Sequence, residues 1–338
     1  MSENTKIEWA DHSWSPWRGC TKVSPGCANC YAETLSKRNP AVLGEWGKGK
    51  PRVLAKNWGD PVKWNKREGG KMVYASEFAA STNPRVFPSL CDWLDDEVPV
   101  EWLARFLVLI NDTPSLDWLL LTKRPENFRS RMEAILSSNP TDPKNTAAHS
   151  LAAGWIGGYY PRNVWFGVSV EDQTRANERV PLLLQVPAKI RWLSMEPLLG
   201  HVDLEMLNDG SWYDGEGANK YDALRGIAYW LQHGSYDHGL GGGPKLDWLV
   251  VGGESGHGAR NCDVKWIEAI LEQSGTAKTP VFIKQLGSRP FRSWDNPPGN
   301  TIPVIAATIG EGWTLEHTKG GDPLEWPSHL RVRQYPTP

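Results

Sequence analysis

The stretch "NVWFGVSVED" (residues 163–172) shows the pattern that decides the fold, a continuous apolar run that ends in polar residues. A run without polar alternation is typical of a strand that is buried on both faces of a parallel sheet. Four more stretches repeat the pattern: "LDWLLLTKRP" (116–125), "IRWLSMEPLLG" (190–200), "LDWLVVGGESG" (246–256) and "PVFIKQLG" (280–287). We therefore predict five strands of a parallel sheet, each followed by a polar turn.

Helical patterns lie between these strands. They are "VPVEWLARFLVLINDT" (98–113), "QTRANERVPLLLQV" (173–186) and "VKWIEAILEQSG" (264–275), the last with Gly275 as the expected helix stop. The alternation predicts an α/β fold, either a parallel sheet or a barrel, whose functional groups gather at the carboxyl ends of the strands.

Two stretches interrupt the alternation, residues 137–162 and 205–245. Because both are rich in Gly, Asn, Asp and Ser, we predict loop insertions there, which could act as lids. From about residue 288 the chain is rich in Pro, Gly and charge, which predicts an irregular C-terminal extension.

The composition is that of a globular protein outside the membrane, with 40% hydrophobic and 22% charged residues. No apolar run approaches the roughly 18 residues that a membrane span needs. The start of the chain, "MSENTKIEWADHSW", has neither the basic nor the apolar part of a signal peptide, so we expect a cytoplasmic protein. A net charge of -2 excludes a strongly basic nucleic-acid clamp but leaves room for a local basic groove.

Three of the five cysteines, Cys20, Cys27 and Cys30, lie in "GCTKVSPGCANCYAE" (residues 19–33). In a cytoplasmic chain, clustered thiols are better interpreted as metal ligands or redox groups than as disulfide partners. A structural zinc site closes with four ligands, and its fourth ligand would be one of three residues: His12, Cys91 or Cys262.

The alternative is a [4Fe-4S] cluster, in which three thiolates leave one iron open to a small molecule. S-adenosylmethionine can chelate that iron through its amino and carboxylate groups, and one electron then cleaves the sulfonium to give a 5'-deoxyadenosyl radical. Tyr31, directly after Cys30, is placed to pack near the adenine.

The polar residues at the strand ends are the candidates for seating S-adenosylmethionine. They are Thr122, Lys123, Ser169, Glu171, Glu196, Glu254 and Ser255. The glutamates could hold the ribose hydroxyls or the amino group, and Lys123 or Lys284 could neutralise a carboxylate or phosphate. Lys284 and Cys262 are the candidate catalytic residues, Cys262 as a hydrogen-atom donor. The alternative is that the strand-end charges pair with each other and that Cys262 is an ordinary buried thiol.

A set of motifs carries a family resemblance. Together with the cysteine loop, the motifs "SLCDWL", "LLLTKRPENF", "VWFGVSVED", "RWLSMEPLLG", "LVVGGESG" and "VFIKQLG" resemble the three-Cys-motif family of phage and prophage proteins, which is radical-SAM-like and of unknown activity. More remotely, the order of cysteine loop, Asp92 turn and "TK" strand resembles spore photoproduct lyase, a radical SAM enzyme. The spacing here is C-x6-C-x2-C, whereas the usual radical SAM spacing is C-x3-C-x2-C.

The resemblance implies a partial TIM-like (β/α)6 barrel of radical SAM type over residues 1–288, with residues 289–338 as the extension packed on it. It also implies a nucleobase or nucleic-acid substrate, in phage-related DNA modification or repair. An external reductant and a dedicated partner protein encoded nearby are the further partners expected.

Two other function classes stay open. One is a zinc-stabilised nucleic-acid-binding or adaptor protein without catalysis. The other is a zinc-dependent hydrolase, for which the chain has no H-E-x-x-H pattern to supply ligands and base. The chain also has no Walker sequence and no G-x-G-x-x-G, so a nucleotide-phosphate fold has little support.

Overall fold

The computed structural model describes residues 2–67, 83–138, 143–208, 219–232, 235–239, 241–293 and 315–337. The chain divides into two compact units. The first comprises Met1–Val168, Leu182–Arg191 and the last two residues, and the second comprises Ser169–Pro181 and Trp192–Pro336. Each unit is described by itself.

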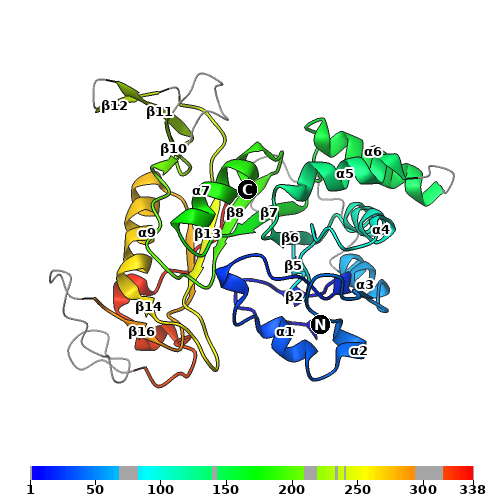
Figure 1. Cartoon of the computed structure of the whole chain (residues 1–338), viewed down its shortest axis with the longest axis horizontal. Coiled ribbons are helices and arrows are strands. Elements are labelled where there is room, and N and C mark those ends of the chain that lie inside the picture. The colour runs from blue at the N-terminus through cyan, green and yellow to red at the C-terminus, as the bar shows by residue number, and fades with distance from the viewer. Residues whose placement is uncertain are drawn as a thin grey trace. The chain divides into compact units, whose positions relative to one another are not determined.

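Parallel strands form the centre of the first unit (Figure 1). The strands β2, β5, β6 and β7 are neighbours in that order, all parallel, and β1 pairs antiparallel with β2. Trp118 pairs with Val164, so that the apolar runs of β6 and β7 lie side by side. The bounds are β1 Ser2–Glu3, β2 His12–Ser13, β5 Arg85–Phe87, β6 Asp117–Thr122 and β7 Val164–Ser169.

Helices of the first unit cover these strands. In α4 (Val100–Asn111), Leu103, Phe106, Leu107 and Ile110 are buried, which is the i, i+3, i+4, i+7 spacing of one helix face. Helix α4 packs with α5 and α6 beside β5 and β6 (Figure 1). The bounds of the other helices are α1 Tyr31–Ser36, α2 Pro40–Leu43, α3 Gly59–Arg67, α5 Asn127–Ser137 and α6 Pro143–Ile156.

Aromatic side chains fill the core of the first unit. Trp14 lies 5.2 Å from Trp58 and 5.9 Å from Trp118, ring centroid to ring centroid, and both pairs meet edge to face. Trp93 stacks on Trp155 with centroids 5.8 Å apart. Such pairs contribute about 0.5–1.5 kcal/mol each beyond the area that they bury. All five of these tryptophans are buried and form part of the core.

The second unit has its own parallel strands, β8, β13 and β15, with Trp248 opposite Trp192 and Leu249 opposite Val281. Helix α9 connects β13 to β15. The C-terminal residues follow the edge of β15, where Ile283 N donates to Val332 O (2.8 Å) and Gln334 N to Val281 O (2.8 Å). The bounds are α7 Gln173–Gln185, β8 Ile190–Met195, β13 Trp248–Gly252, β14 Cys262–Asp263, α9 Val264–Ala277, β15 Val281–Gln285, β16 Pro290–Phe291, η2 Pro323–Glu325 and η3 Ser328–Leu330.

Both predictions of loop insertions are wrong where the chain is described. Residues 137–162 contain the fourteen-residue helix α6, in which Ala148, Ala152 and Trp155 are buried at i, i+4 and i+7. Residues 205–245 contain an antiparallel sheet in the order β12-β11-β10-β9. Its bounds are β9 Leu207–Asn208, β10 Lys220–Asp222, β11 Ile227–Gln232 and β12 Ser235–His238. The period of α6 is concealed because Ala, Leu and Ile also lie outside its buried stripe, and the short strands of the sheet stand within a sequence rich in Gly and Asp.

Gly275 is not a helix stop. Helix α9 continues to Ala277, and Lys278 ends it in the left-handed region with φ 60°. The lysine side chain carries its charge at the negative end of the helix, where a cation is favourable.

The five predicted strands and three predicted helices are all present, so the mixed α/β class with parallel strands is confirmed. Among the described residues, no helix is both long enough and apolar enough to cross a membrane.

Candidate functional site

The cysteine loop begins directly after β3 (Trp17–Arg18), which pairs antiparallel with β4 (Val53–Leu54). Gly19 has φ 104°, and a Cβ there would lie 2.9 Å from both Glu45 O and Arg52 Cδ, so the loop can leave β3 only through a glycine. Pro25–Cys27 forms a short 3-10 turn, and α1 starts one residue after Cys30. All three thiols are free and half-buried.

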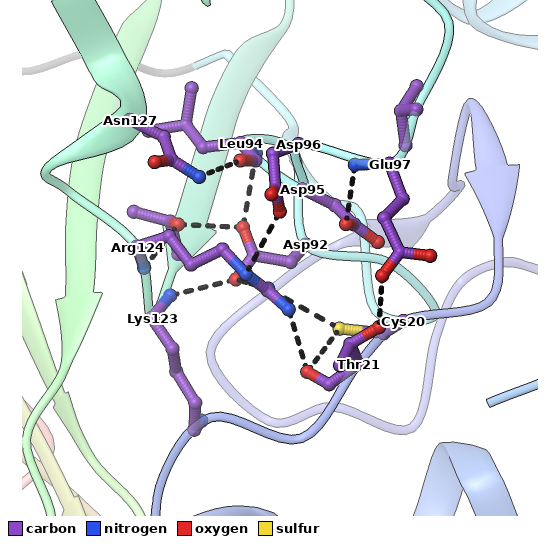
Figure 2. Close-up of polar contacts among 12 residues, drawn as sticks. Cys20, Thr21, Asp92, Leu94, Asp95, Asp96, Glu97, Lys123, Arg124 and Asn127 are labelled. Carbon is purple, nitrogen blue, oxygen red and sulfur yellow. Dashed lines mark hydrogen bonds and ion pairs between the residues drawn. The ribbon is translucent and has the colours of Figure 1, made fainter. Parts of the chain in front are cut away.

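Cys20 contacts a buried arginine from the end of β6 (Figure 2). Arg124 Nη1 donates to Cys20 Sγ (3.6 Å), and Nη2 donates to Thr21 O (2.7 Å). The same Nη1 lies 2.9 Å from Asp92 Oδ2, and Arg124 is 4% exposed. We call Cys20, Thr21, Asp92, Thr122 and Arg124 the Arg124 cluster. It fixes the first thiol of the loop to the carboxyl ends of β5 and β6.

Asp92 is the anchor of the Arg124 cluster. Its carboxylate accepts from Thr122 Oγ1 (2.6 Å), Lys123 N (2.9 Å) and Leu94 N (3.1 Å) as well as from Arg124. These donors satisfy the buried charge, which would otherwise be costly. The predicted strand-end residues Thr122 and Lys123 are thus part of the support of the cysteine loop.

The electrostatics keep Cys20 protonated in the absence of a metal. Burial, reinforced by the negative charge of Asp92, raises the pKa of the Cys20 thiol to about 12, although Arg124 acts in the opposite direction. Burial by itself would lower the pKa of Arg124, but Asp92, Cys20 and Asp95 together outweigh it and the pKa is raised, so the guanidinium stays charged. A metal would take Cys20 as thiolate, with Arg124 already in place to stabilise the negative sulfur.

A second buried ion pair supports the loop from the other side. Arg52 Nε donates to Asp95 Oδ2 (2.8 Å), and its Nη2 donates to Thr21 Oγ1 (2.8 Å). Glu97 accepts from Thr21 Oγ1 (3.2 Å) and from Gly49 N (2.7 Å). Sequence analysis missed Arg52, Asp95 and Glu97. The acidic run "CDWLDDE" (91–97) was the available signal, since such a run in a buried turn needs cationic partners.

Tyr31, predicted to pack near adenine, is 56% exposed, and its hydroxyl donates to Ser89 O (2.6 Å). Its role toward a cofactor stays a prediction.

The other predicted cofactor residues lie in the second unit, mostly as ion pairs. Glu171 is fully buried against Arg179 (2.9 Å), and Glu254 is 7% exposed and paired with Arg260 (2.6 Å). Glu196 pairs with Lys284 (2.7 Å), with 12% and 25% of their side chains exposed. Ser169 is buried and Ser255 is half-buried. Of these ion pairs, Glu196–Lys284 is the one that combines partial exposure on both sides with a place at two strand ends.

The three candidates for a fourth ligand have different surroundings. Cys91 follows β5, and its backbone bridges to Gly19; burial and the neighbouring Asp92 raise its pKa well above the usual value. His12 is stacked on Trp64, with ring centroids 4.5 Å apart. Cys262 lies in the second unit and is 1% exposed, and burial raises its pKa to about 12. Within the described parts of the chain, no three His, Cys, Asp or Glu side chains are grouped so that they could hold a metal ion.

The donor set nevertheless fits an iron–sulfur cluster in its chemistry. Cys20, Cys27 and Cys30 offer three sulfur ligands from one loop, and Arg124 offers a hydrogen bond to one of the sulfurs. Hydrogen bonds to ligand sulfurs and the surrounding charge are among the features by which proteins tune such clusters. Thiolates also suit zinc, so that the donor set alone leaves both metals possible.

A family model described as "Protein of unknown function (DUF5131)" matches residues 4–305. Neither a curated protein nor a solved structure was found to match the chain.

Proposed function

The chain belongs to the DUF5131 family, and we propose that it is a radical S-adenosylmethionine-type enzyme. Cys20, Cys27 and Cys30 would hold a [4Fe-4S] cluster. The proposal includes a partial (β/α)6 barrel of radical SAM type and a cytoplasmic location. When bound and reduced, such a cluster supplies the electron that cleaves S-adenosylmethionine to a 5'-deoxyadenosyl radical.

One observation supports this proposal best, namely the attachment of Cys20 to the carboxyl ends of β5 and β6 through Arg124 and Asp92 (Figure 2). Functional groups of parallel α/β folds gather at this edge. A thiol that served only to close a surface loop would not need a buried guanidinium beside its sulfur. Arg124 orients Cys20, offsets the negative charge of a ligated sulfur and keeps water from it.

The remaining roles follow from exposure. Glu196 and Lys284 are partly accessible, so they can exchange their mutual ion pair for polar groups of a ligand. Glu171 is enclosed by its arginine and can act only by shaping the end of β7. A nucleobase or nucleic-acid substrate is proposed on the family resemblance alone.

Anaerobic purification with iron, sulfide and zinc analysis tests the proposal. We expect about four iron and four sulfide per chain, lost in Cys27→Ala and retained in Cys262→Ala, whose thiol lies in the other unit. After reduction, the paramagnetic resonance spectrum should change when S-adenosylmethionine is added. About one zinc per chain, with no iron, would instead support the zinc-stabilised binding or adaptor protein.

A further inference from the structure

The surface around the cysteine loop has a charge unlike the rest of the chain. Residues 18–56 contain eight Lys or Arg and two Glu, whereas the whole chain has a net charge of -2. Lys22 and Lys37 share one of these glutamates, Glu33, at 2.7 and 3.5 Å. Lys50 pairs with the other, Glu45, at 3.3 Å. Three exposed cations of the segment are in no ion pair with the residues that the structure describes, namely Arg38, Lys48 and Lys56. The segment therefore has positive charge left over to meet an outside anion.

Two aromatic side chains lie among these cations. Tyr31, the first residue of α1, is 56% exposed, and the bond from its hydroxyl to Ser89 O (2.6 Å) fixes the ring at the surface. Leu35 is 38% exposed and follows at i+4 on the same face of the helix. Trp46 is half-buried, and its backbone bridges to Cys20. Rings interleaved with cations are typical of surfaces that bind single-stranded nucleic acids.

Short contacts join the cations and the rings into one surface. Helices α1 and α2 pack against each other (Figure 1). The turn of residues 46–50 lies beside the cysteine loop, since Gly47 N donates to Cys20 O (2.9 Å). Lys22 Nζ donates to Ala28 O (3.4 Å) within that loop. We call this set the cysteine-loop surface, and it comprises Lys22, Tyr31, Lys37, Arg38, Trp46, Lys48 and Lys50.

We propose that the cysteine-loop surface binds a single-stranded nucleic acid. Its lysines and Arg38 contact the phosphates, and Tyr31 and Trp46 stack on bases. The inference goes beyond the proposed function, because binding at this surface requires neither a metal nor a radical.

The shape of the surface favours a single strand over a duplex. Helix α1 has six residues and α2 has four, about one to two turns each, which is too short to lie along a major groove and read it. Stacking on a side chain also needs a base that is free of a duplex stack. An acidic protein would complement the charge as well. Rings that alternate with cations, however, match the alternation of bases and phosphates along a strand.

Lys48→Gln tests the phosphate contacts, with Lys245→Gln as the matched control. Both lysines are exposed and in no ion pair with described residues, and Lys245 lies in the second unit. Binding to a fluorescein-labelled strand of about 20 thymidines is measured by fluorescence anisotropy at several salt concentrations. We expect Lys48→Gln to weaken binding and to reduce the slope of log K against log salt by about 0.7. Lys245→Gln should change neither.

Tyr31→Leu tests the stacking, with Tyr159→Leu as its control. Tyr159 is 86% exposed and lies just after α6 in the same unit. We expect Tyr31→Leu to weaken binding of the thymidine strand about fivefold or more. Tyr159→Leu should weaken it less than about twofold, and so should Tyr31→Phe, which keeps the ring.

Several results would overturn the proposal. They are no binding of the strand by the wild type, or equal binding by Lys48→Gln, Tyr31→Leu and their controls. Tighter binding of a duplex, or of polyglutamate as an acidic polypeptide, than of the single strand would overturn it too. A uridine strand of the same length shows whether DNA or RNA is preferred. 5'-Deoxyadenosine formation is assayed separately, and its absence would contradict the proposed function while strand binding persists.

Discussion

Replacement of Arg124 by methionine should destabilise the first unit far more than its single side chain suggests. The change removes the donors to Asp92, Cys20 and Thr21 but leaves the Asp92 carboxylate buried, with Thr122, Lys123 and Leu94 as its remaining donors. Breaking a buried ion pair by removing one partner costs about 3–5 kcal/mol. Because three donors to Asp92 remain, we expect the lower end, about 3 kcal/mol.

The assay is urea unfolding followed by tryptophan fluorescence, which reports on the aromatic cores of both units. Arg129→Met is the control, because Arg129 forms an exposed ion pair with Glu133 (2.9 Å) on α5 and should contribute less than about 0.5 kcal/mol. The double variant Asp92→Asn/Arg124→Met should lose less stability than the sum of the two single changes. Each single change leaves the other residue's charge buried without its ion-pair partner, and the double variant removes both charges. An Arg124→Met chain as stable as Arg129→Met would refute this account of the cluster.

Three further outcomes are expected. Gly275→Ala should stabilise the chain by about 0.5–1 kcal/mol, because a Cβ there meets nothing within 4 Å in α9. Gly253→Ala should destabilise it by about 2 kcal/mol or more, because its Cβ would lie 2.2 Å from Leu286 O. Thermal unfolding compares the two variants, and a gain in stability from Gly253→Ala would contradict the packing. Arg179→Met should cost about 3 kcal/mol in urea unfolding, because it leaves Glu171 buried without its cation; a loss below about 0.5 kcal/mol would show the pair to be dispensable. The raised pKa of Cys262 means that the folded chain keeps a proton that the unfolded chain loses above pH 9. The free energy of unfolding should therefore fall by up to about 1.4 kcal/mol per pH unit between pH 9 and 12. Cys262→Ala should lack this part of the fall, and identical profiles of stability against pH in wild type and Cys262→Ala would contradict it.

The strands could be predicted because their apolar runs are continuous and end in polar residues. "LDWLLLTKRP" predicts both β6 and the polar turn that follows it, and this turn proves to support Cys20. The interior of a parallel sheet leaves little choice of side chain, so the sequence carries a strong signal there.

The structure of the two insertions and the buried ion pairs could not be predicted from the sequence in the same way. Helix α6 hides its buried stripe of Ala148, Ala152 and Trp155 because Ala, Leu and Ile also lie at its other positions, so that the sequence shows no clear apolar face. The bonds from Arg52 to Asp95 and from Arg124 to Asp92 join residues 43 and 32 positions apart. Such pairs depend on the folded arrangement of loops, which local periodicity does not encode.

The measurement that tests the central claim most directly is the formation of 5'-deoxyadenosine. The anaerobically purified, dithionite-reduced chain is incubated with S-adenosylmethionine, and products are separated by liquid chromatography, with Cys20→Ala as the comparison. The account predicts 5'-deoxyadenosine from the wild type and none from Cys20→Ala. An iron-loaded wild-type chain that leaves S-adenosylmethionine intact, or a chain that carries only zinc, would contradict it.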